Sequence, residues 1–275
     1  MKFIFLMSMF LIPILASAQD ESSFGWMSWT LAVNAKDTVP GQWEGSDRLR
    51  AWLTKNSTTT KDSIRKADLY GSRALMALKH GYYDLAFADY EMSARLNPKS
   101  RGQVGWRYVF LLRDYARALA HLEAFDALTP NIDDPIDDYS VSYLKGRAQA
   151  GLKNYEQAIK EYTVAIANRE NRHGPEWVDY RYSVARAVSY LGLRQAQHAL
   201  VDLDKALKNN PKSAMAHYHR GRALQLLGRN SEAREAYRDA LFFVRSQPFE
   251  RDFYYEQPDA AYEGQIEAAL QALKP

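Results

Sequence analysis

Residues 143–165 read YLKGRAQAGLKNYEQAIKEYTVA, and this stretch decides the fold. Gly146 and Ala158 stand twelve residues apart, and Tyr162 and Ala165 follow at intervals of four and three residues. Small and apolar residues thus recur at helical spacing on both sides of a short polar turn. Small side chains let two helices approach closely, and an aromatic ring fills the gap beside them. The stretch therefore predicts a helix-turn-helix hairpin.

The same pattern recurs along the chain. A key alanine occurs in five segments: Ala86, Ala118, Ala158, Ala199 and Ala233. Four residues after each alanine stands a large apolar residue: Tyr90, Leu122, Tyr162, Leu203 and Tyr237. Three residues further on, the segments carry Ser93, Phe125, Ala165, Ala206 and Ala240. Gly221 matches Gly146, and three segments close with Pro98, Pro130 and Pro211, because proline cannot continue a helix.

These segments resemble the tetratricopeptide repeat, a helix-turn-helix unit of about 34 residues. That repeat has small residues at its eighth, twentieth and twenty-seventh positions and an aromatic residue at its twenty-fourth. The resemblance covers about residues 64–247. It implies an all-α fold, a right-handed α-solenoid of about five such repeats with a C-terminal capping helix.

The spacing of the repeats is irregular. The five key alanines are separated by 32, 40, 41 and 34 residues, as the differences between their numbers show. We expect the extra residues to form loops at 131–138 and 168–176. Aspartates fill the first of these loops, and acidic residues before a helix commonly complement its dipole. A calcium loop is disfavoured, because the required glycine and terminal glutamate are missing.

The first eighteen residues read as a secretory signal peptide. Lys2 precedes an apolar run from Phe3 to Leu15, and Ala16 to Ala18 form a small-residue cleavage site, with cleavage expected after Ala18. The run is shorter than the roughly 20 residues that span a membrane, so no stable anchor is expected after cleavage. The chain has no cysteine, hence neither disulfides nor a lipid-modified cysteine. We therefore predict a periplasmic or secreted protein.

Three further segments follow the signal peptide: a Trp-rich segment at 19–60, the repeat array at 61–247, and a linker with a capping helix at 248–275. The Trp-rich segment holds four of the six tryptophans, and it either caps the first repeat, occupies the groove of the array or docks onto a partner. Asp259 to Leu273 read as one amphipathic helix that covers the last repeat.

Composition excludes two classes of protein. The chain is 47% hydrophobic and 25% charged, which excludes wholesale disorder. Its net charge is only +3 and no run of Lys or Arg occurs, so nucleic acid is not an expected partner.

Arginines and tyrosines of the first helix in each repeat are the candidate peptide-binding residues, because the first helices line the concave surface of such arrays. The arginines aligned at the ninth position are Arg73, Arg107, Arg147, Arg186 and Arg222. The tyrosines four residues before an arginine are Tyr143, Tyr182 and Tyr218. In repeats one and four this alignment assumes a turn two residues longer than standard.

Two interpretations of the arginines stay open. Guanidinium groups on one face would bind the carboxylates of an acidic peptide or of a C-terminus, with the tyrosines adding apolar area. Alternatively, each arginine pairs with an Asp or Glu of a neighbouring helix. The Lys and Asn set of the carboxylate-clamp members of the family is not reproduced, so their specificity is not carried over.

No motif for catalysis, metal binding or a cofactor is evident, and we predict none of the three. The expected function is a non-catalytic scaffold that binds a protein or peptide in its concave groove, in the cell envelope or outside the cell. The alternative is a structural oligomer whose groove holds its own N-terminal segment or a second copy. An envelope enzyme or accessory subunit acting on glycans would need paired carboxylates in a pocket, which sequence cannot show.

Overall fold

The structure is a computed structural model that describes residues 46–246 and 257–273. The predicted signal peptide at 1–18, residues 19–45 of the Trp-rich segment and the linker residues 247–256 lie outside the described residues. Nothing in the described part of the chain forms a helix long and apolar enough to cross a membrane.

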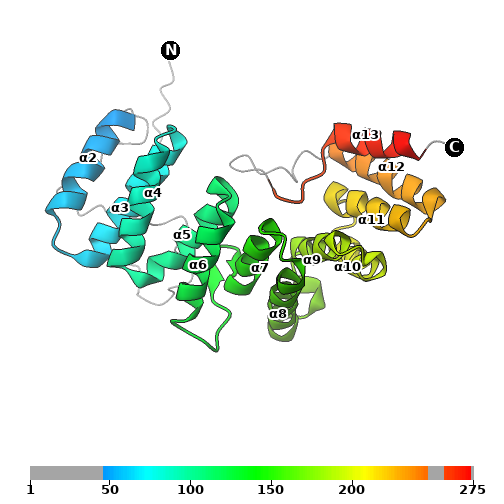
Figure 1. Cartoon of the computed structure of the whole chain (residues 1–275), viewed down its shortest axis with the longest axis horizontal. Coiled ribbons are helices and arrows are strands. Elements are labelled where there is room, and N and C mark those ends of the chain that lie inside the picture. Colours follow the sequence, from blue (N-terminus) through cyan, green and yellow to red (C-terminus); the bar gives the residue numbers. More distant parts are fainter. Residues whose placement is uncertain (1–45, 247–256, 274–275) are drawn as a thin grey trace, which may run out of the picture.

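The described chain is an array of paired helices, so the predicted all-α repeat fold is confirmed (Figure 1). In each pair we call the first helix A and the second helix B. The pairs are α3 (Ser63–Lys79) with α4 (Tyr83–Leu96), α5 (Arg101–Arg107) and its continuation η2 (Tyr108–Leu112) with α6 (Tyr115–Asp126), α7 (Val141–Gly151) with α8 (Tyr155–His173), α9 (Tyr180–Gly192) with α10 (Ala196–Asn209), and α11 (Ala214–Leu226) with α12 (Asn230–Ser246).

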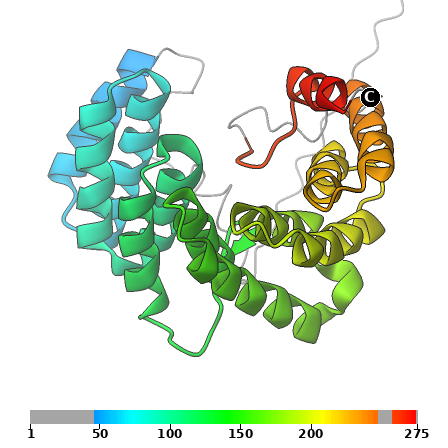
Figure 2. The same cartoon turned by 45° about the vertical axis from the view of Figure 1, so that its right-hand side comes forward.

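Each pair packs against the next, and the whole array curves (Figures 1 and 2). The final described helix, α13 (Glu263–Ala272), packs on α12 and lies across the opening of the curve from the first repeats. We call the side of the array that faces this opening the inner side.

Small residues stand where the helices nest, as predicted. All five key alanines are fully buried, and so are the apolar residues four positions after them. A Cβ added to Gly146 would lie 2.6 Å from the ring of Tyr162, and one added to Gly221 would lie 2.5 Å from the ring of Tyr237. These distances are too short for any side chain, so the glycines allow the aromatic rings to lie directly on helix A.

The turns between helices A and B have the same construction in four of the five repeats. In repeats one, three, four and five they contain three residues, and the middle one is left-handed: Gly81, Lys153, Arg194 and Gly228, with φ of 78°, 64°, 59° and 74°. The predicted longer turn in repeats one and four is therefore wrong. With the standard turn, the fully buried Ala74 and Ala187 occupy the eighth position, twelve residues before Ala86 and Ala199.

Repeat two differs by one residue. Its helix A changes from α-helix to the π-helix η2, which accommodates one residue more than an α-helical turn would. Gly105 therefore faces Leu122, and a Cβ on Gly105 would lie 2.7 Å from the Leu122 side chain. Gly105 stands thirteen residues before Ala118 instead of twelve, so Arg107 also shifts relative to the arginines of other repeats.

The two expected long loops have different structures. The loop at 131–138 is confirmed and includes β1 (Pro135–Ile136), which pairs in a short antiparallel hairpin with β2 (Tyr139–Ser140). Within 168–176 the prediction of a loop is wrong, because α8 continues to His173 before η3 (Pro175–Trp177) begins. A second short helix, η1 (Pro98–Ser100), joins α4 to α5.

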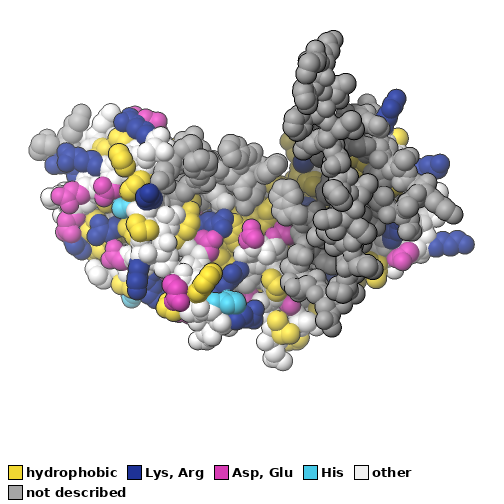
Figure 3. All heavy atoms as spheres, turned by 180° about the vertical axis from the view of Figure 1, so that it is seen from behind, with side chains coloured by type: hydrophobic (Ala, Val, Ile, Leu, Met, Phe, Trp, Pro, Cys, Tyr) yellow, Lys and Arg dark blue, Asp and Glu magenta, His cyan; other side chains and the backbone are white. Residues whose placement is uncertain are grey.

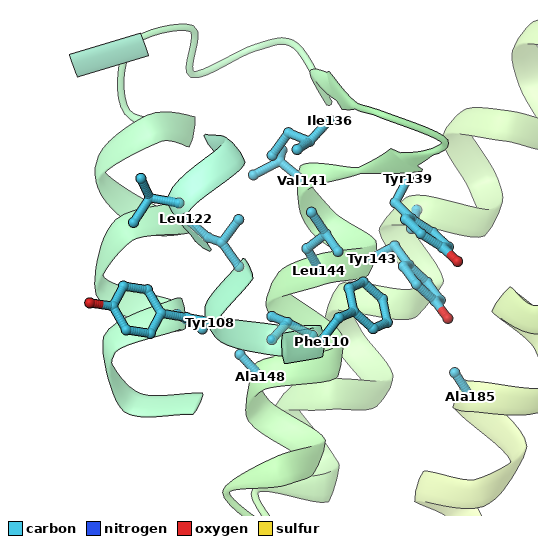
Figure 4. Close-up of a cluster of buried hydrophobic side chains, with 14 of the residues drawn as sticks. Tyr108, Phe110, Leu122, Ile136, Tyr139, Val141, Tyr143, Leu144, Ala148 and Ala185 are labelled. Atoms are coloured by element: carbon cyan, nitrogen blue, oxygen red, sulfur yellow. The ribbon is translucent and has the colours of Figure 1, made fainter. Parts of the chain in front are cut away.

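The hairpin belongs to a hydrophobic core that extends across several repeats (Figure 4). Ile136 and Tyr139 pack from the hairpin onto side chains of η2 and α7, among them Phe110 and Tyr143. Asp133, from the same loop, accepts a hydrogen bond from the backbone N–H of Ser142 at the start of α7 (2.9 Å), as the helix-dipole interpretation predicted for this loop.

Both ends of the described array are covered by an extra helix. At the start, α2 (Ser46–Thr59) lies within the Trp-rich segment and packs on α3 through Leu49, Leu53 and Leu69. These residues cap the array instead of entering its inner side. At the other end α13 buries Ile266 against the last repeat, but it begins at Glu263 and not at Asp259 as expected.

Candidate functional site

Arg73 and Arg186 form the same ion pair in repeats one and four. The Nε and Nη2 of Arg186 donate to the two carboxylate oxygens of Asp202 on α10, both at 2.7 Å. Arg73 binds Asp89 on α4 in the same way, at 2.6 and 2.7 Å. Both aspartates are almost completely buried. For these two arginines the ion-pair interpretation is confirmed.

The same two arginines also reach the helix that precedes their own helix pair. Arg186 donates to Thr163 of α8 at 3.0 Å, and Arg73 donates to Thr54 of α2 at 3.2 Å. Each guanidinium thus joins its own helix pair to the helix before it. Because all three of its nitrogens bond to neighbouring helices, it contributes to stacking of the array.

Arg107, in the shifted repeat two, has a third arrangement. Its Nη1 donates to the carbonyl and the side-chain oxygen of Gln103, both at 3.1 Å, and its guanidinium lies 5.7 Å from the centre of the Tyr90 ring. The five arginines therefore do not share one face, because they occupy three different positions relative to the small residue of their helix.

Two of the three predicted groove tyrosines lie in the core. Tyr143 is 2% exposed and Tyr182 is fully buried, with their rings stacked at 4.1 Å between centres. Tyr139 stacks on the other side of Tyr143, and the Tyr182 hydroxyl accepts a hydrogen bond from the backbone N–H of Ser140. Tyr143 and Tyr182 therefore hold the hairpin against α7 and α9. Tyr218, in contrast, is partly exposed and lies under the guanidinium of Arg222.

Arg147 of α7 has a partner far away in the sequence. Its side chain is 5% exposed, and its Nη1 donates to the carboxylate of Asp259, 112 residues later. Burial lowers the pKa of Arg147, but Asp259, Tyr143 and Tyr162 together outweigh burial and hold this pKa well above its ordinary value. Burial raises the pKa of the nearby Tyr162 hydroxyl, Arg147 opposes this and Asp259 adds to it, and no described residue accepts the hydrogen of this hydroxyl.

His219 of α11 binds the main chain of the same aspartate. Its Nε2 lies 3.0 Å from the carbonyl oxygen of Asp259, and its Nδ1 lies 3.1 Å from Nη1 of Arg222. Since Arg222 can only donate, Nδ1 must accept, and Nε2 carries the proton that binds the Asp259 carbonyl. Burial and the neighbouring Arg222 lower the pKa of His219 to about 4, against the opposing effect of Asp259. The imidazole is therefore neutral at pH 7.

A tight turn presents Asp259 to these residues. The backbone N–H of Ala260 donates to the carbonyl of Gln257 at 3.1 Å, with Pro258 and Asp259 as the central residues of the turn. Proline at the first central position fits a β-turn. Figure 2 shows this segment, directly before α13, on the inner side of the array. One turn thus contacts repeat three through Arg147 and repeat five through His219, and we call residues 257–262 the C-terminal segment.

Charged side chains elsewhere on the described residues are more dispersed. Lys and Arg are intermixed with Asp and Glu on the described surface visible in Figure 3. A polar pocket lies between the β1–β2 hairpin and the end of α8, lined by residues that include Asp133, Asp138, Arg169 and Arg172. Among the described residues no group of three or more His, Cys, Asp or Glu side chains could hold a metal ion.

Sequence reasoning selected Arg147 and Arg222 but missed Asp259 and His219. Asp259 was expected to begin the capping helix, although the Pro258–Asp259 pair is itself a turn signal. No local pattern relates Asp259 to an arginine 112 residues away. Binding of a peptide by the predicted residues stays a prediction.

Comparisons with known proteins agree with this architecture. Residues 184–251 match the tetratricopeptide repeat family. The structure is similar to that of MamA (residues 41 to the end) from Desulfovibrio magneticus RS-1, with 24% identity, a TM-score of 0.54, and coverage of 66% of this chain and 96% of that chain. No curated protein sequence matches.

Two other solved structures are similar at lower identity. One is YrrB, described as a TPR protein with an unusual peptide-binding site, with 18% identity, a TM-score of 0.50, and coverage of 71% of this chain and 94% of that chain. The other is the APC/C hetero-tetramer Cut9–Hcn1, with 16% identity, a TM-score of 0.56, and coverage of 84% and 40%. At these identities the similarity shows the fold: an α-solenoid of tetratricopeptide type, an architecture typical of protein–protein interaction.

Proposed function

We propose that this protein is a non-catalytic scaffold that binds a polypeptide segment on the inner side of its helical array, in the cell envelope or outside the cell. One observation carries the proposal. The inner side already holds a polypeptide without regular helix or strand structure, the C-terminal segment, through contacts from two different repeats.

The chemistry of these contacts suits peptide recognition. Arg147 binds a side-chain carboxylate, whereas His219 binds the main-chain carbonyl of the same residue. A site that binds both a side-chain carboxylate and a main-chain carbonyl distinguishes a peptide from a free anion. Tyr218 and Arg222 are partly exposed on α11 beside this contact and offer an aromatic ring and a guanidinium to a longer ligand.

The location outside the cytoplasm rests on the sequence alone. Lys2, the apolar run that follows and the small residues ending at Ala18 have the composition of an export signal. N-terminal sequencing of the protein from fractionated cells tests this part. We expect Gln19 as the first residue of an extracytoplasmic protein, and an intact Met1 in the cytoplasmic fraction would contradict it.

Site-specific photo-crosslinking in living cells tests peptide binding. A photoreactive amino acid replaces Tyr218, beside the C-terminal segment, and in a matched variant it replaces Val201, which is exposed on helix B of repeat four. We expect a distinct cross-linked partner protein from position 218 and not from position 201. Equal products from both positions, or none from position 218, would overturn the proposal.

A further inference from the structure

We propose that Arg147, Tyr162 and His219 form an acceptor for an aspartate presented at a tight turn, that the chain's own Gln257–Ala260 turn is its resident occupant, and that the partner displaces this turn with the same chemistry. The inference rests on the proposed function and names the class of partner: a peptide with an aspartate at an exposed turn. It also makes the C-terminal segment a competitor for the site.

The acceptor is built for an anion. Arg147 is as buried as a core residue, and a guanidinium in that environment needs a paired carboxylate. Its own repeat supplies none to Arg147, whereas Arg186 pairs with Asp202 of the same repeat. Among the residues that the structure describes, the acidic partner of Arg147 comes only with the C-terminal segment. Tyr162 adds a buried hydroxyl whose pKa both Arg147 and Asp259 affect, and whose hydrogen no described residue accepts, so it can donate to a ligand bound there.

The occupant can leave without dismantling a helix pair. Arg73 and Arg186 bind aspartates sixteen residues away on helix B of their own repeat, so their pairs form with the repeat. Asp259 instead lies in a turn between α12 and α13, and a carboxylate from another molecule can replace it while every A–B pair stays intact. A ligand that shares this chemistry therefore competes directly with Asp259.

The site selects aspartate in a peptide over a simple anion. The neutral His219 donates to the carbonyl of the residue whose carboxylate binds Arg147, which fixes the distance between the two groups. Glutamate places its carboxylate one methylene further from that carbonyl and does not satisfy both contacts. Asparagine keeps the shape but loses the charge that the buried guanidinium requires.

Competition between a synthetic peptide and the resident turn tests the inference. The probe is a fluorescent peptide of sequence QPDAAY, which reproduces residues 257–262, and the control peptide is QPNAAY. In the wild-type chain the resident turn has an effective concentration on the order of millimolar, so the probe binds weakly. In Asp259→Asn the resident turn loses its charge, and we expect the probe to bind at least tenfold more tightly than to wild type.

The controls separate specific binding from loss of structure. Adding Arg147→Gln to Asp259→Asn abolishes binding of QPDAAY, whereas Asp239→Asn, at an exposed carboxylate, leaves wild-type binding unchanged. Equal affinity of Asp259→Asn for QPDAAY and QPNAAY, or no gain over wild type, would overturn the inference. An oligomer that dissociates in Asp259→Asn would show that the turn comes from a second copy, which overturns the intramolecular occupant.

Hydrogen exchange of the wild-type chain gives a result that does not depend on any variant folding. Millimolar QPDAAY accelerates exchange of the Ala260 amide, whose hydrogen bond closes the resident turn, whereas QPNAAY does not. Unchanged exchange contradicts displacement. If the peptide does not change hydrogen exchange but a partner protein is cross-linked at position 218, this inference is wrong and the proposed function stands. If the peptide binds but no partner is cross-linked, the proposed function alone is contradicted.

Discussion

Arg186 of α9 and Arg147 of α7 lie on neighbouring A helices and both bind an aspartate, but the two ion pairs have different consequences. Arg186 stands immediately before the small residue of its helix, and Arg147 stands immediately after it. Two positions correspond to about 200° around a helix. Arg186 therefore joins helices within the stack, whereas Arg147 binds a segment on the inner side. Moving the arginine by two positions along helix A therefore changes its role from a contact between stacked helices to a candidate ligand contact.

The largest expected difference between the two pairs is in stability. Asp202→Ala leaves the largely buried guanidinium of Arg186 without its carboxylate, and we expect a loss of about 3 kcal/mol in the free energy of unfolding. In Asp259→Ala the C-terminal segment can leave the inner side, so that water reaches the guanidinium of Arg147, and we therefore expect less than half of that loss. Urea unfolding followed by circular dichroism measures both variants.

Replacing both partners of the stacking pair is the control for that experiment. Arg186→Met with Asp202→Leu removes the unpaired charge, and such replacements are often neutral or stabilising. The double variant should therefore unfold nearer to wild type than Asp202→Ala does. Equal losses in Asp202→Ala and Asp259→Ala would show that the two pairs do not differ as inferred.

Acidification is the next largest effect and acts on the inner-side contact. Because the pKa of His219 is about 4 in the folded chain and about 6.5 when unfolded, the unfolded chain binds the proton more readily between these values. The contribution of His219 is complete above pH 6.5 and is lost as the pH falls to about 4, by roughly 3 kcal/mol. The charged groups facing the imidazole are Asp259, Arg222 and Arg147.

A comparison with His219→Gln isolates this histidine from other groups that titrate in the same range. Glutamine can donate to the Asp259 carbonyl but does not titrate. The stability difference between wild type and the variant should shrink as the pH falls from 6.5 to 4. A difference that stays constant over this range would contradict the buried neutral imidazole.

Lysine substitutions test the geometry of the two pairs with a smaller effect. Arg186 uses two nitrogens on two carboxylate oxygens, whereas Arg147 uses one nitrogen. Lysine retains the charge but not the fork, so Arg186→Lys should lose about 1–2 kcal/mol of unfolding free energy. Arg73→Lys should match it, and Arg147→Lys should lose less. A larger loss for Arg147→Lys would contradict the single contact.

Much of the fold could be predicted from the sequence because the alanines, glycines and tyrosines that nest the helices recur at regular spacing. Ala158, Tyr162 and Gly146 are placed as their positions in the repeat predict. The arginine positions could not be aligned as reliably, since charged residues do not mark the register, and one assumed turn length moved Arg186 by two positions. Asp259 was missed because its contact depends on the path of the chain after α12.

The smallest expected effect concerns the turns between helices A and B. Their length determines how the positions of helix A align with the key alanine of helix B, and their left-handed residue differs between repeats. Gly228 and Gly81 adopt the left-handed conformation without steric cost, whereas Lys153 and Arg194 adopt it with a Cβ. Arg194→Gly should therefore raise the free energy of unfolding by about 0.5–1 kcal/mol, less than the full left-handed penalty because glycine also gives the unfolded chain more freedom. Gly228→Ala should lower it by a similar amount, and thermal unfolding of both variants measures the two shifts. Shifts of the same sign in both variants would mean that side-chain contacts, and not the left-handed backbone, determine the stability of these turns.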